Sequence, residues 1–87
     1  MTLTEKEKQE LAKQLEADLL KLYDSPILNL EQLKRALNYR SVAAVKQAIN
    51  RNTFPVPTFV IPNRRNRFAL AKDVAAFLAK QAFNRQE

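Results

Sequence analysis

Four residues between positions 42 and 51 have the side chains and the spacing needed to contact the edges of nucleic-acid bases. They follow an i, i+3, i+4, i+7 pattern, which places them on one face of a helix: Ala43, Lys46, Gln47 and Asn50. Gln and Asn can each bond two atoms of adenine, Lys can reach guanine or phosphate, and a small Ala can touch a thymine methyl. No acidic residue interrupts this face. The pattern predicts a recognition helix for the DNA major groove; an ordinary solvated helix face is the alternative.

A second basic cluster follows this helix. Runs rich in β-branched and aromatic residues at 58–61 and 67–70 predict two strands, and Pro62 stops the first. The tip between them carries three arginines and two asparagines, namely Asn63, Arg64, Arg65, Asn66 and Arg67. Arginines on such a hairpin can enter a narrow minor groove or bind phosphates beside it. A solvated turn is the weaker interpretation.

The hairpin needs unusual backbone chemistry because the chain contains no glycine. Asn63 and Asn66 are therefore expected to supply any positive φ angles at the tip. Phe59 and Phe68 are predicted to anchor the hairpin in the core. Truncation of either to Ala should then cost roughly 3 to 5 kcal/mol of stability.

The elements before the hairpin fit a helix, a turn and a second helix. Asn29 can cap a helix over about 30–37, with Gln32 at the reciprocal position. Asn38 can take a left-handed conformation in the turn, and the Ser41 hydroxyl can cap the helix over about 42–51. Val42, Val45, Ala48 and Ile49 form its expected inner face. Arg40 and Arg51 lie beside the ends of this helix and are expected at the major groove and its backbone.

Two further helices flank this region. Thr4 and Glu7 form a capping box for a helix over about 5–22, whose inner stripe is Leu11, Leu15, Leu19 and Leu22, with Ala12 beside it. This stripe either packs on the chain's own core or pairs with a second copy. The segment 24–26 should end this helix, because Pro26 disfavours helical geometry in the residue before it, and 24–27 is the only stretch that resembles a linker. A closing helix over about 71–83 is predicted to be scaffold, with Val74, Phe77 and Leu78 inward.

Composition limits the function classes. The chain has 87 residues, enough for one domain, and a net charge of +6. Residues 1–24 carry four basic and six acidic side chains, whereas residues 25–87 carry eleven basic and three acidic ones. The positive field therefore belongs to the part after residue 24, which suits a polyanionic partner. We treat residues 1–24 as an amphipathic helix for packing or dimerisation, and residues 25–87 as the DNA-binding domain.

Several kinds of chemistry are not expected. Without Cys and His, the sequence lacks a disulfide framework, the common zinc sites and the usual nucleophilic triads. We therefore expect no enzyme, no metal and no cofactor. No signal peptide or membrane span is apparent, so a cytoplasmic, nucleoid-associated protein is expected.

Residues 28–80 resemble the small winged-helix proteins related to phage excisionases and AlpA-type prophage regulators, which are similar to the DNA-binding domain of MerR-type regulators. The matching segments are 30–33 with 37–39, 41–49, 51–55 and 73–78. The resemblance implies that the second helix enters the major groove through Lys46, Gln47 and Asn50. It also implies that a wing carrying Arg64, Arg65 and Arg67 contacts the minor groove or backbone. Asn38 and Asn52 stand where the family usually has glycine, and residues 42–44 replace an Arg or Ser/Thr.

The expected fold is therefore mainly α with a small β-hairpin wing, a winged helix-turn-helix preceded by an amphipathic helix. The expected function is a small sequence-specific transcriptional regulator of phage, prophage or plasmid type. A recombination directionality factor that bends DNA at an integrase site and a protein-interaction adaptor remain alternatives, with RNA binding and catalysis behind them. The expected partners are double-stranded DNA, a second copy through the N-terminal helix, and an integrase or RNA polymerase. The predicted DNA-binding residues are Arg40, Ser41, Ala43, Lys46, Gln47, Asn50, Arg51, Asn63, Arg64, Arg65 and Arg67.

Overall fold

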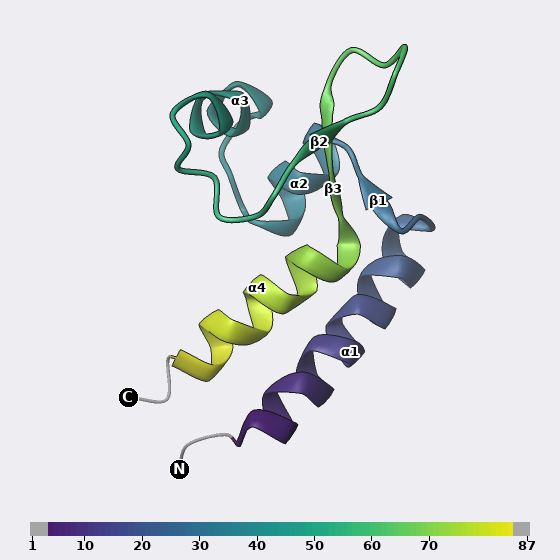
Figure 1. The fold of residues 1–87 in the computed structure, drawn as a ribbon, viewed down its shortest axis with the longest axis vertical. Coiled ribbons are helices and arrows are strands. Elements are labelled where there is room, and N and C mark those ends of the chain that lie inside the picture. The colour runs from purple at the N-terminus through teal and green to yellow at the C-terminus, as the bar shows by residue number, and fades with distance from the viewer. Residues whose placement is uncertain (1–3, 85–87) are drawn as a thin grey trace.

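The computed structural model describes residues 4–84 and is mainly helical, with a small antiparallel sheet. In chain order the elements are α1 (Glu5–Tyr23), β1 (Ile27–Leu28), α2 (Leu30–Ala36), α3 (Val42–Asn50), β2 (Phe59–Val60), β3 (Arg67–Leu70) and α4 (Ala71–Asn84). Figure 1 shows two parts. The long helices α1 and α4 lie side by side, and α2, α3 and the sheet form a cap beyond one end of that pair. The mainly α class with a β-hairpin agrees with the sequence prediction.

Helix α1 begins at its predicted capping box and ends at Tyr23, one residue beyond the expected end. The Glu7 amide donates to Thr4 Oγ1 (3.1 Å), and the Thr4 amide donates to the Glu7 carboxylate (2.8 Å), which completes the capping box. At the other end Asp24 takes a left-handed conformation with φ of 57° and donates its amide to the Leu20 carbonyl (2.8 Å). These bonds satisfy backbone groups that a helix leaves free at its ends.

The apolar face of α1 packs on α4 within the same chain, and the two helices are antiparallel (Figure 1). Lys8 lies near the start of α1, and its Nζ is 5.3 Å from the ring centroid of Phe83, near the end of α4. Leu19 is buried, but Leu22 is 71% exposed, so the prediction that Leu22 belongs to the inner stripe is wrong. At 100° per residue, Leu22 points about 80° away from a face centred on Leu19 and Tyr23. Tyr23 packs against the core in its place.

Asparagine supplies the left-handed residue that ends α2, as predicted. Asn38 has φ of 60°, and the next amide, that of Tyr39, donates to the Lys34 carbonyl (2.8 Å). This is the Schellman arrangement, in which glycine is the usual residue at the left-handed position. The turn that follows leads to Ser41, whose hydroxyl accepts the Ala44 amide (3.0 Å) and caps α3.

The same arrangement ends α3. Asn52 has φ of 59°, and the Thr53 amide donates to the Ala48 carbonyl (2.9 Å). Asn38 and Asn52 therefore both adopt left-handed backbone at the ends of their helices. Asparagine tolerates this conformation better than other residues with a Cβ atom.

The sheet has three strands in the order β1-β3-β2. Strand β3 lies in the middle, with Phe59 opposite Phe68 on one side and Leu28 opposite Ala69 on the other. Strand β1 was not predicted, because its residues fall in and beside the stretch that resembled a linker. A strand of two residues is too short to show an alternating pattern.

The core differs from the prediction at the aromatic residues. Phe59 and Phe68 are only half-buried and pack on each other, with ring centroids 6.4 Å apart, so neither is the expected core anchor. Their segment is instead buried through Val56 and Ala69. Tyr39 is half-buried, and its ring centroid lies 5.7 Å from that of Phe54. The largest fully buried side chains are Leu28, Leu33, Val45 and Val74.

No helix among residues 4–84 is both long enough and apolar enough to cross a membrane.

Candidate nucleic-acid interface

Helix α3 presents the predicted polar face to solvent. Ala43, Lys46, Gln47 and Asn50 are all exposed, and Val45 on the opposite side of the helix is fully buried. Burial of Val45 fixes the rotation of α3, because its side chain packs in the core of the cap. The four exposed side chains therefore share one outward surface. Ser41, also a predicted DNA-binding residue, already uses its hydroxyl to cap the helix.

The hairpin tip begins with a tight turn. The Arg64 amide donates to the Ile61 carbonyl (3.0 Å), with Pro62 and Asn63 between them. Asn63 has φ of 67°, and Pro followed by a positive φ is the pattern of a type II turn. Asn66 is not among the described residues with positive φ, so only one of the two asparagines fulfils that prediction. Arg64 and Arg65 are exposed.

Arg67 occupies a different position from the other two arginines. It is the first residue of β3, as the predicted strand over 67–70 has it, but it is half-buried, whereas the sequence analysis grouped it with the others on the tip. Its Nε donates to Thr58 Oγ1 (2.7 Å) and its Nη2 donates to the Thr58 carbonyl (2.9 Å). The guanidinium therefore joins the two arms of the hairpin. Thr58 was not among the predicted site residues; it directly precedes β2, whose Val60 is the residue paired with Arg67.

A groove of about 160 Å³ lies between α3 and the hairpin and brings the two predicted clusters together. Helix α3 contributes Lys46 and Asn50 to its lining, and the hairpin contributes Arg65, Asn66 and Arg67. Leu30 and Ile49, which the sequence did not assign to the site, complete the lining. Residues far apart in the sequence thus form one cationic surface.

The charge of this region has a single sign. Residues 32–72 contain nine Lys and Arg side chains and no Asp or Glu. The ion pairs of residues 4–84 join Lys8 to Glu5 and Lys34 to Glu31, both at 3.2 Å and on exposed surface. Within the described chain, the arginines and the lysine of the groove therefore have no carboxylate partner and can bind an anion without breaking an ion pair.

Two predicted residues lie outside this groove. Arg51 is exposed at the C-terminal cap of α3, and Arg40 lines a different groove on the other flank of that helix. In the part of the chain that the structure covers, no three acidic side chains gather as metal ligands would. The surface is suited to hydrogen bonding and to binding negative charge.

Comparisons with protein-family models, with curated proteins and with solved structures find no match.

Proposed function

We propose that this chain is a DNA-binding protein of the winged helix-turn-helix class, in which α3 enters the major groove and the β2–β3 hairpin is the wing. The observation that carries the proposal is the groove shared by Lys46 and Asn50 of α3 and Arg65 of the hairpin. Six of the seven lining residues belong to the stretch 32–72, which contains no Asp or Glu. A helix for base edges beside a basic hairpin is a common arrangement for binding duplex DNA.

Within that class, we propose a sequence-specific regulator of phage, prophage or plasmid type, working at the nucleoid. The sequence resemblance to excisionases and AlpA-type regulators supports this narrower assignment. A recombination directionality factor would use the same surface. The two differ in what they do to the DNA, because a directionality factor bends its site and a simple repressor need not.

The exposed side chains divide into two groups by their chemistry. Gln47 and Asn50 carry amides that can each bond an adenine in the major groove. Arg64 and Arg65 stand free at the tip and are suited to phosphates or the minor groove. Arg67 supports the hairpin through Thr58 and adds charge to the groove.

The first experiment is selection of binding sites from a random pool of duplex DNA, repeated between 50 and 200 mM salt. Enrichment of one motif supports the regulator, and the spacing of half-sites reports whether two copies bind. Salt-sensitive binding without enrichment favours an architectural protein. Absence of binding at the lower salt concentration contradicts the proposal.

Variants test the division of labour. Gln47→Ala or Asn50→Ala should weaken binding to the selected site by about 1 to 3 kcal/mol and relax base preference there. Arg64→Ala should weaken binding to all sequences and reduce the salt slope by about one. Gln81→Ala, which removes an exposed glutamine from α4, is the matched control and should leave both properties unchanged. Equal losses on selected and random DNA for both classes of variant would refute the division.

A further inference from the structure

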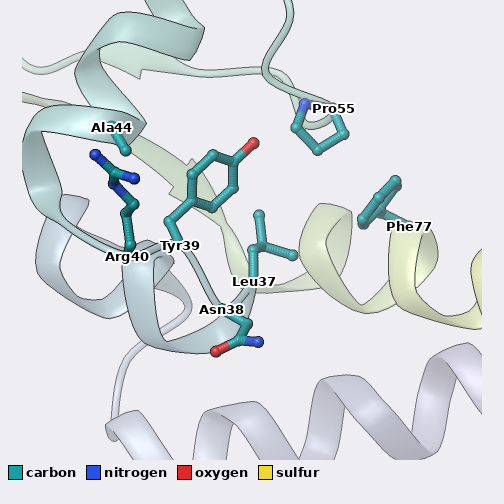
Figure 2. A pocket seen from close by; sticks show the side chains of 7 residues that line it. All are labelled: Leu37, Asn38, Tyr39, Arg40, Ala44, Pro55 and Phe77. Atoms are coloured by element: carbon teal, nitrogen blue, oxygen red, sulfur yellow. The ribbon is translucent and has the colours of Figure 1, made fainter.

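A second groove, of about 520 Å³, lies on the flank of α3 away from the hairpin. The turn after α2 forms one wall, and Ala44 of α3, Pro55 of the loop after α3 and Phe77 of α4 complete the lining. Figure 2 shows the ring of Tyr39 standing in the groove, with Arg40 on one side of it and Leu37 toward Phe77 on the other. The groove thus joins the turn after α2, α3, the loop after α3 and α4, on a face that the α3–hairpin groove does not include.

The two grooves face different directions. Helix α3 contributes Ala44 to this groove and Lys46 to the groove beside the hairpin. At 100° per residue these two side chains point about 160° apart around the helix axis. A ligand in one groove therefore leaves the other accessible, and both can be occupied at once.

The lining has an uneven chemistry. Leu37, Tyr39, Pro55 and Phe77 provide apolar surface, and the one charged lining side chain is Arg40. Arg40 is exposed and takes part in neither ion pair of residues 4–84. The complementary ligand has an apolar group beside a carboxylate, because a guanidinium binds carboxylates through paired hydrogen bonds.

The groove is open to solvent, which favours a protein segment over a small molecule as its ligand. Arg40 and Pro55 are both exposed. Sites for small molecules usually enclose about 70 to 90% of the ligand surface. A protein segment does not need that enclosure, since its own neighbouring residues cover the rim around a buried anchor.

We propose that this groove binds an acidic segment of a partner protein. The segment places one aromatic or large aliphatic side chain against Leu37, Tyr39 and Phe77, and an adjacent carboxylate on Arg40. This function does not depend on DNA binding, because the groove is separate from the α3–hairpin groove. Together, the two surfaces would join a protein to a DNA site.

The test is selection of short random peptides displayed on phage against the immobilised full chain, without DNA. We expect enriched peptides to combine an aromatic residue or Leu with a nearby Asp or Glu. A synthetic peptide of the enriched sequence should shift the amide resonances of residues 37–40 and 77 in the NMR spectrum. No enrichment, or enriched peptides without a carboxylate, would overturn the proposal.

Charge reversal tests the role of Arg40. Arg40→Glu should lower the affinity for the selected peptide by about tenfold or more, because an attraction between opposite charges becomes a repulsion. Arg35→Glu reverses another exposed arginine, outside the groove lining, and should have little effect. Equal losses for both variants would show attraction to net charge alone and would contradict a specific site.

A second variant keeps the test valid if Arg40→Glu does not fold. Pro55→Glu places a carboxylate on an exposed part of the rim and should also lower the affinity for the peptide. It leaves the α3–hairpin groove unchanged, so DNA binding should persist. Undiminished peptide binding by a folded Pro55→Glu variant would place the peptide elsewhere.

Discussion

At the scale of single residues, the chain forms its turns of positive φ without glycine. The described residues with positive φ are Asp24, Asn38, Asn52 and Asn63. Two of these end helices in Schellman turns, one follows α1, and one lies at the corner of the hairpin turn. A residue with a Cβ atom is strained in this conformation, and Asn and Asp relieve part of the strain through local hydrogen bonds.

Asn52 tests this interpretation. We expect Asn52→Ala to lower the free energy of unfolding by about 1 kcal/mol, and Asn52→Gly to maintain or raise it, because glycine has no steric penalty at positive φ. Urea denaturation followed by circular dichroism measures both. The control is Asn66→Ala, at an exposed asparagine without positive φ, which should stay within about 0.5 kcal/mol of the parent. Similar losses at both positions would contradict the strain argument.

Arg65 and Arg67 form a second matched pair. Both line the α3–hairpin groove, but only Arg67 is half-buried and bonded to Thr58. Arg67→Ala should lower stability by about 1 to 2 kcal/mol, whereas Arg65→Ala should change it by less than about 0.5 kcal/mol. Both should weaken DNA binding. Thermal unfolding together with a fluorescence binding assay separates the effects, and equal stability of the two variants would contradict a structural role for Arg67.

At the scale of elements, the antiparallel packing of α1 on α4 is the main contact between the N-terminal helix and the rest of the chain. Leu19 is buried in the core, while Leu22, three residues later, is 71% exposed. Two leucines on one helix therefore have opposite roles. This contrast allows the packing to be tested without a change of residue type.

Leu19→Ala should cost about 2 to 5 kcal/mol, because it leaves a cavity in the core. Leu22→Ala should change stability by less than about 0.5 kcal/mol, because its side chain already contacts water. The midpoints of urea unfolding measure both. A loss for Leu22→Ala as large as that for Leu19→Ala would mean that α1 is rotated relative to this structure.

The loss of stability predicted for truncating a hairpin phenylalanine must be lowered, because the two rings are only half-buried. Because Phe68 is only half-buried against Phe59, we now expect Phe68→Ala to cost about 2 kcal/mol instead of the larger value for a fully buried ring. Chemical denaturation of the variant checks this value. No measurable loss would mean that the pair of rings does not stabilise the hairpin.

Local signals explain which elements could be predicted from the sequence. The helices were predictable because their caps and apolar periodicity are local, as at Thr4, Asn29 and Ser41. The exposed face of α3 followed from the same periodicity. The third strand, the exposure of Leu22 and the Thr58 contact of Arg67 depend on how distant segments meet. No local pattern carries that information.

At the scale of the whole molecule, the arrangement of α1 bears on the oligomeric state. The apolar stripe of α1 was expected to pack either on the chain's own core or on a second copy. It packs on α4 of its own chain. We therefore expect a monomer in the absence of DNA, and sedimentation equilibrium measures this directly. A dimer that dissociates on Leu22→Lys would instead show that the exposed end of α1 joins two copies.

The charge distribution of the whole molecule predicts a strong response to salt. If about five side chains contact phosphates, the slope of log K against log salt should be about −4.5, and affinity should fall by roughly 500-fold from 50 to 200 mM. Fluorescence anisotropy with a labelled duplex provides this measurement. A slope near zero would contradict an electrostatic interface.

The antiparallel course of α1 and α4 also has a mechanical consequence. The first residues of α1 and the last residues of α4 lie together at the end farthest from the hairpin (Figure 1). A force applied between these two points would separate the helices like a zipper, one turn at a time, instead of sliding them past each other. In an optical trap, we expect α1 and α4 to part at low force before the cap of α2, α3 and the sheet unfolds.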